Sequence, residues 1–302
     1  MDRIHTMELV RSYQVGELSR RDFLARVSTA LGSAAAASML VAACTPVTGP
    51  TEPVLLATQP AAVDQSQPTP GVVAATVSYP DGKGGTLTGY LARPAGDDKA
   101  PAVIVIQEWW GLNDNIKDIA RRFAVEGFVA LAPDLYHGQV VSEPNEARKL
   151  VMALDMDAAV GEIQAAIGFL LQQQAVAGPK VGLTGFCMGG RLVLMTALVD
   201  DRLGAAVPWY GGPLTAEQAG QVKAPILGLY GEQDGGIPAA SVRAMQQGLD
   251  AAGIANDMVI YPGAQHAFFN DTRPSYHPQA AADAWQRALA WFRMYLVGQR
   301  GK

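Results

Sequence analysis

The sequence predicts an α/β domain whose sheet is mainly parallel, with helices on both faces. From Val72 onward, short apolar segments of strand length alternate with segments of helix length, as in successive βαβ units. The apolar segments are nearly continuous hydrophobic runs, so we expect both faces of the sheet to be covered. With 302 residues, of which 49% are hydrophobic, the chain is long enough for one such domain with extensions.

The first two strands are expected to form a hairpin, because 72–79 and 86–93 flank the turn sequence Asp81-Gly-Lys-Gly-Gly85. Later strands are predicted at 102–107, 128–132, 181–185, 205–210, 226–230 and 258–261. Helices are predicted at 115–125, 145–173 with an interruption near Asp155, 191–199, 239–251 and 280–296. Function in such sheets gathers at the carboxyl ends of the strands, so polar residues there are candidates.

Residues 1–44 are predicted to be an export signal. Ser19-Arg20-Arg21-Asp22-Phe23-Leu24 is a twin-arginine signature, and a weakly apolar run follows it. That run ends in Leu40-Val-Ala-Ala-Cys44, which resembles a bacterial lipobox, so Cys44 is the candidate lipidation site. Residues 45–71, rich in Pro, Thr, Ala and Gln, are predicted to be a flexible linker, and 72–302 the folded domain.

These features predict an exported protein, in the periplasm or at the cell surface, tethered to a membrane through lipidated Cys44. The alternatives are a plain cleaved signal, an uncleaved anchor, or a chance Arg-Arg pair on an amphipathic helix. A net charge of −5 without a run of Lys or Arg argues against a nucleic-acid partner. Cys44 and Cys187 are the two cysteines, too few for a disulfide framework or a cysteine-rich zinc site.

The clearest chemical signal is Gly185-Phe-Cys187-Met-Gly189, which lies between an apolar strand and an apolar helix. This pattern is the nucleophile elbow of α/β-hydrolases, with cysteine where serine is usual. The nucleophile of such an elbow has strained backbone, and glycines lie two positions away because side chains would not fit there. Taken alone, a buried structural cysteine beside turn glycines explains the pattern equally well.

Two residues at other strand ends complete a predicted triad with Cys187. Asp234 follows the strand at 226–230, and His266 follows the strand at 258–261. Their order along the chain is the nucleophile–acid–histidine order of α/β-hydrolases. His266 would take the thiol proton and later protonate the leaving alcohol, and Asp234 would fix the imidazole tautomer.

Neighbouring positions are candidates for the rest of the site. The backbone N–H groups of Met188 and Trp109 would form the oxyanion hole. Aromatic residues near the strand ends are candidates for an apolar substrate pocket, although core packing explains each of them as well: Trp110, Tyr136, Tyr210 and Phe268. We expect no metal and no organic cofactor.

Together these residues resemble the dienelactone hydrolase family, which are α/β-hydrolases with a Cys-His-Asp triad. The resemblance covers roughly 72–296 and is carried by seven motifs in order: Val105-Ile-Gln-Glu108, Ala132-Pro-Asp-Leu-Tyr136, Leu154-Asp-Met-Asp157, Gly185-Phe-Cys-Met-Gly-Gly190, Tyr210-Gly211, Gly231-Glu-Gln-Asp234 and Gly263-Ala-Gln-His266. It implies a hydrolase that cleaves an ester or lactone through a Cys187 thiolate. It also implies that Glu108 contacts the resting thiol and helps to gate thiolate formation.

The resemblance is weaker at the residues that would bind the substrate. Dienelactone is an anionic lactone, and the family enzyme that cleaves it grips the carboxylate with two arginines. The position of one, four residues after His266, is Asn270 here. The loop that carries the other, His137 to Asn145, is shortened, and Arg148 is the candidate replacement. The sequence therefore predicts the hydrolytic mechanism more firmly than a dienelactone substrate.

Two other functions remain open from the sequence. One is a surface-tethered binding protein with a relict triad, and the other is a thiol redox sensor. The second is weaker because Cys44, the other cysteine, would be lipidated or removed with the signal. We expect a small-molecule substrate and a monomer, although no sequence feature decides the oligomeric state.

Overall fold

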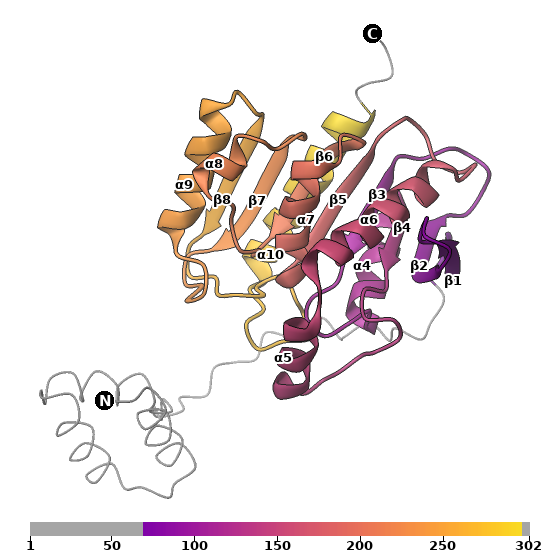
Figure 1. The fold of residues 1–302 in the computed structure, drawn as a ribbon, viewed down its shortest axis with the longest axis horizontal. Helices are drawn as coiled ribbons and strands as arrows, with labels where there is room; N and C mark the ends of the chain where they lie inside the picture. The colour runs from indigo at the N-terminus through magenta and orange to yellow at the C-terminus, as the bar shows by residue number, and fades with distance from the viewer. Residues whose placement is uncertain (1–68, 298–302) are drawn as a thin grey trace, which may run out of the picture. The chain divides into compact units, whose positions relative to one another are not determined.

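The computed structural model describes residues 69–297, so the predicted signal, Cys44 and nearly all of the predicted linker lie outside the described residues. Within this range, eight strands form one sheet in the order β1-β2-β4-β3-β5-β6-β7-β8 (Figure 1). Strands β3 to β8 run parallel, whereas β1 and β2 pair antiparallel at one edge. This arrangement confirms the mainly parallel α/β fold that the sequence predicts.

The strands are β1 (Val72–Pro80), β2 (Thr86–Pro94), β3 (Ala102–Ile106), β4 (Val129–Pro133), β5 (Val181–Phe186), β6 (Leu203–Trp209), β7 (Ile226–Gly231) and β8 (Asn256–Tyr261). The helices are α4 (Asp114–Val125), α5 (Pro144–Ala153), α6 (Met156–Leu171), α7 (Met188–Val199), α8 (Ala216–Ala219), α9 (Ala239–Ala251) and α10 (Pro278–Phe292), followed by the π-helical turn η1 (Arg293–Val297).

The predicted elements are present, including the interruption near Asp155, and two other details differ. The segment at 145–173 divides into α5 and α6 because Asp155 caps α6, its carboxylate accepting from the N–H groups of Asp157 and Ala158. The last predicted helix divides into α10 and η1. The short helix α8 was not predicted, since four residues carry no helical periodicity.

The hydrophobic core lies on both faces of the sheet. Every residue of β3, β4, β5, β6 and β7 is buried. On one face α4 packs against α10, with the ring centroids of Phe123 and Trp285 4.6 Å apart. Helices α6 and α7 pack against each other in front of the sheet as drawn in Figure 1, where α4 and α10 lie behind it. The prediction of a sheet covered on both faces is therefore confirmed.

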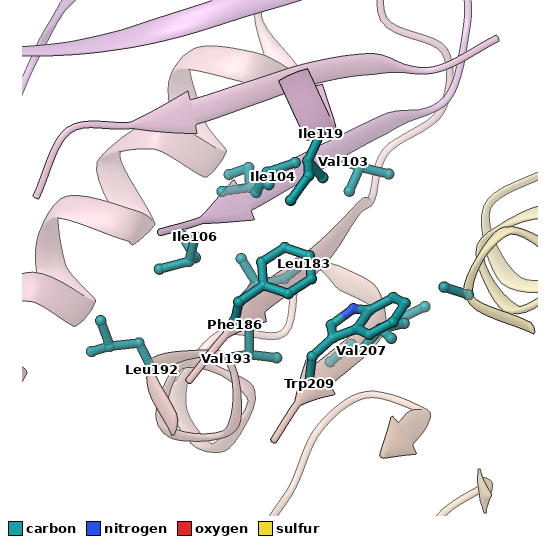
Figure 2. Close-up of a cluster of buried hydrophobic side chains, with 14 of the residues drawn as sticks. Val103, Ile104, Ile106, Ile119, Leu183, Phe186, Leu192, Val193, Val207 and Trp209 are labelled. Carbon is teal, nitrogen blue, oxygen red and sulfur yellow. The ribbon is translucent and has the colours of Figure 1, made fainter. Parts of the chain in front are cut away.

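The centre of this core surrounds the strands that lead to the candidate site. Figure 2 shows side chains of β3, β5 and β6 between Ile119 of α4 and the pair Leu192 and Val193 of α7. Phe186 and Trp209, the last residues of β5 and β6, are both buried, and their ring centroids lie 5.3 Å apart. Close packing of this kind holds the carboxyl ends of the strands in fixed positions. No helix within residues 69–297 is long and apolar enough to cross a membrane.

Candidate active site

Cys187 lies on the sharp turn between β5 and α7. Its backbone has φ 55° and ψ −115°, a conformation that is uncommon for a residue with a side chain and costs about 1–3 kcal/mol. Hydrogen bonds hold the turn on both sides, because the Cys187 N–H donates to the carbonyl of Trp209 at 3.1 Å and its own carbonyl accepts from the Arg191 N–H at 3.2 Å. The turn thus holds the sulfur at the carboxyl end of β5.

The glycines around Cys187 are required by close backbone approach. A Cβ atom on Gly185 would lie 2.6 Å from the Gly189 carbonyl oxygen, and one on Gly189 would lie 2.5 Å from the Gln107 carbonyl oxygen. Such separations are too short for real Cβ contacts, and the opposing atoms are backbone. The expectation that side chains would not fit at these two positions is confirmed.

His266 and Asp234 come together after β8 and β7. The Nδ1 atom of His266 lies 2.6 Å from Oδ2 of Asp234, whose side chain is 2% exposed, whereas that of His266 is 41% exposed. The other carboxylate oxygen of Asp234 accepts from the N–H of Gly236 at 2.9 Å. Each carboxylate oxygen of Asp234 therefore has a partner. Because His266 contacts Asp234 through Nδ1, its Nε2 atom takes no part in that contact.

The neighbours of His266 favour its protonated form. Burial lowers the pKa of this imidazole, but hydrogen bonding with Asp234 and Cys187, together with the charges of both, raises it to about 10. His266 consequently carries its proton at neutral pH. The three predicted triad residues thus lie together, and His266 interacts with Cys187 through a hydrogen bond and through charge.

A cavity of about 570 Å³ opens beside Cys187 and His266. It is lined by Glu108, Trp109, Trp110, Cys187, Gln265, His266, Ala267, Arg273, Pro274 and Ser275. The guanidinium carbon of Arg273 lies 3.8 Å from the centre of the Trp110 ring, a cation–π contact. Mostly apolar walls with a few convergent polar groups are typical of a small-molecule site.

Glu108 reaches this cavity from the end of β3 and is 3% exposed. Its Oε2 accepts from the Nδ2 of Asn270 at 2.7 Å, and its Oε1 accepts from the hydroxyl of Tyr210 at 3.4 Å. Burial raises the pKa of Glu108, whereas the Asn270 hydrogen bond and the nearby charges of His266 and Arg273 oppose that rise. Glu108 and Cys187 line the same cavity.

Three of the four predicted pocket residues do not line this cavity. Tyr210 and Phe268 are 1% and 0% exposed and pack edge to face, with ring centroids 5.4 Å apart. Tyr136 is 4% exposed, donates its hydroxyl to Sδ of Met188 at 3.3 Å, and lines a separate cavity of about 260 Å³. These three predictions are wrong because rings that follow strands also fill the core beneath the site. Trp110 does line the cavity.

The sequence interpretation missed the main cation of this cavity. Arg273 lies seven residues after His266, in the loop that joins β8 to α10, whereas the suggested replacement Arg148 lies exposed on α5. The loop carries no periodic pattern that marks its inward-facing residues. The one feature of the sequence that could have indicated Arg273 is its place in the same loop as His266. Asn270, at the position where the family enzyme has a substrate-binding arginine, is 2% exposed and contacts Glu108.

The candidate oxyanion donors lie at the same end of the sheet. Met188 is the first residue of α7, where backbone N–H groups have no intrahelical acceptor and the helix dipole favours negative charge. Trp109, the residue that follows Glu108 in the chain, also lines the cavity. Among the described residues, no group of three or more His, Cys, Asp or Glu side chains is arranged to hold a metal ion.

The turn geometry predicts a strong asymmetry between two glycine substitutions. Gly189→Ala should destabilise the fold by about 1–3 kcal/mol, because its Cβ meets backbone of β3 and the following residue. The matched control is Gly161→Ala in α6, where nothing lies within 4 Å and alanine should stabilise the helix by about 0.5–1 kcal/mol. Urea unfolding of both variants measures the difference, and equal stabilities would contradict the close approach.

Comparison with known proteins identifies the family of this chain. Residues 87–296 match the dienelactone hydrolase family. A protein of Escherichia coli K12 provisionally named carboxymethylenebutenolidase is 39% identical over 246 residues, which are 76% of this chain and 89% of that protein. The protein usf of Aquifex pyrophilus is 38% identical over 220 residues, which are 70% of this chain and 94% of its own length.

Solved structures show the same fold over the same part of the chain. The crystal structure of a provisionally assigned dienelactone hydrolase from Klebsiella pneumoniae has a TM-score of 0.69 and 36% identity, covering 74% of this chain and 99% of that one. A dienelactone hydrolase-like promiscuous phosphotriesterase from metagenomic libraries has a TM-score of 0.67 and 28% identity, covering 74% and 99%. The chain is a hydrolase that belongs to the dienelactone hydrolase family.

Proposed function

We propose that this protein hydrolyses carboxylic esters or lactones through a covalent thioester on Cys187. The observation that carries the proposal is the convergence of Cys187, on its strained turn, with His266 and its buried partner Asp234, beside one cavity. The relatives named carboxymethylenebutenolidase support a lactone as the substrate class.

The protonated state of His266 sets the first step. An imidazolium beside a cysteine favours the thiolate, which is the reactive form of the nucleophile. The Cys187 thiolate attacks the carbonyl carbon, and the carbonyl oxygen becomes an oxyanion. The N–H groups of Met188 and Trp109 stabilise this charge, a contribution of about 3 kcal/mol for each donor in comparable enzymes.

Collapse of the oxyanion breaks the bond to the leaving oxygen. His266 donates its proton to that oxygen, and the acyl group remains on the sulfur of Cys187. Water then attacks the thioester while His266 accepts a proton from it, which releases the acid and restores the resting pair. Asp234 keeps the imidazole in one tautomer throughout, as its 2.6 Å contact with Nδ1 favours.

Arg273 supports a substrate that carries a negative charge. Among the described residues its buried Nε has no hydrogen-bond partner, and stacking on Trp110 holds the planar group at the cavity wall. A guanidinium held in this way suits a carboxylate, which accepts two parallel hydrogen bonds. Arg273 would then take the place of the arginine that Asn270 replaces.

Cleavage of p-nitrophenyl acetate by the wild type, and its loss in Cys187→Ala, tests the proposed nucleophile. We expect slow turnover that alkylation of the thiol abolishes. Retention of full activity in Cys187→Ala would disprove this mechanism. Saturable ligand binding without hydrolysis of any ester or lactone tested would instead favour a binding protein with a relict triad.

Arg273→Gln tests the anionic substrate. The kcat/KM for mono-p-nitrophenyl succinate should fall by about tenfold to a hundredfold, the effect of losing one charge-assisted hydrogen-bonding partner. The kcat/KM for neutral p-nitrophenyl butyrate should change by less than about threefold, because that ester makes no ion pair. Arg148→Gln on α5 is the matched control and should affect neither ester. Equal losses on both esters in Arg273→Gln would contradict the assignment.

Export and membrane tethering belong to the same proposal. They rest on Arg20-Arg21 and on the lipobox-like sequence before Cys44. Mass spectrometry of the mature protein should find Cys44 as the N-terminal residue, carrying lipid. A mature protein that begins at Met1 would contradict cleavage of the signal at Cys44 and lipidation of Cys44, and one that begins after Cys44 would contradict lipidation alone.

A further inference from the structure

Asn270 is buried in the loop between His266 and α10, and its amide is held in one orientation. Its Oδ1 accepts from the backbone N–H of Thr272 at 3.0 Å and from the hydroxyl of Thr272 at 2.6 Å. Because both donors occupy the oxygen, the Nδ2 group must face the other way. It donates to Oε2 of Glu108 at 2.7 Å.

The next residue fastens the loop from its outer side. Oδ2 of Asp271 lies 2.6 Å from a guanidinium nitrogen of Arg122, and Oδ1 accepts from Nδ2 of Asn115 at 3.2 Å. Both partners lie on α4, which packs on the sheet. Asn270 therefore contacts Glu108 from a loop that is tied to a rigid element, and being 2% exposed it has almost no surface left for a substrate.

We propose that Asn270 is a positioning residue, whose amide holds Glu108 at the cavity wall and favours its carboxylate form. This inference rests on the proposed role of Cys187 as the nucleophile. A neutral donor stabilises a buried carboxylate without adding a charge to the cavity. It leaves Arg273, three residues further along the same loop, free to meet the substrate.

The other groups that face Glu108 are consistent with this role. The Tyr210 hydroxyl donates to Oε1, and burial together with the charges of Glu108 and Cys187 raises the pKa of Tyr210 well above its usual value, so it remains a donor. His266 and Arg273 stabilise the carboxylate by charge. Burial acts in the opposite direction, so removal of the 2.7 Å hydrogen bond should favour protonation of Glu108.

The rate of Cys187 alkylation by iodoacetamide, measured between about pH 4 and pH 10, reports this change without an ester substrate. Like charges that share a cavity repel each other, so titration of Glu108 should appear as an inflection in the alkylation rate plotted against pH, and Glu108→Gln should remove that inflection. In Asn270→Ala that inflection should move to higher pH by about one unit, since the lost donor stabilised the charged form. Thr272→Val, which removes one of the two donors that orient the amide, should move it in the same direction by less.

Asn256→Ala is the matched control. It removes an asparagine whose Nδ2 donates to the carboxylate of Asp250 at 2.8 Å, at the opposite end of β8, and it should leave the inflection in place. An unmoved inflection in Asn270→Ala and Thr272→Val would overturn the proposal, as would an inflection that persists in Glu108→Gln. If Asn270→Ala loses ester hydrolysis but its alkylation inflection does not move, the proposed role of Asn270 is wrong. If the inflection moves but the wild-type protein cleaves no ester, only the proposed function is wrong.

Discussion

The candidate site depends on the close approach of the ends of β3, β5 and β6 around the turn at Cys187. Glycine is needed on this turn because backbone atoms of Gln107 and Gly189 occupy the space that side chains would take. The hydrogen bond from the Cys187 N–H to Trp209 ties the turn to β6, and the buried rings of Phe186 and Trp209 fill the core beneath it. The strained backbone of Cys187 is thus maintained by the packing of the sheet.

Charge in the site is controlled by groups that are themselves buried and hydrogen-bonded. Asp234 is held by the N–H of Gly236 and in turn holds His266. Glu108 is held by Asn270 and Tyr210. Removing a buried partner leaves the other group with its full desolvation cost, so each of these contacts affects protonation as well as position. The loop after β8 supplies both His266 and Asn270, the hydrogen-bond partner of Glu108, and so links His266 with Glu108.

The sequence predicts the fold, which is confirmed, and it places Cys187, Asp234 and His266 at the ends of strands, where the structure has them. Both predictions follow from rules of position. Buried parallel strands are recognisable as apolar runs, and Cys187, Asp234 and His266 each follow such a run. The wall of the cavity was not predictable in the same way. An aromatic residue after a strand, such as Phe268, fits a core as well as a pocket, and Arg273 lies in a loop where no period separates inward from outward positions.

The central claim is that Cys187 carries the acyl group during turnover. Mass spectrometry of the protein quenched in acid during the reaction with p-nitrophenyl acetate tests it most directly. We predict an added acetyl group on the peptide that contains Cys187, and its absence from Cys187→Ala. Hydrolysis that proceeds with the acetyl group on another residue, or with an equal adduct in Cys187→Ala, would contradict the account.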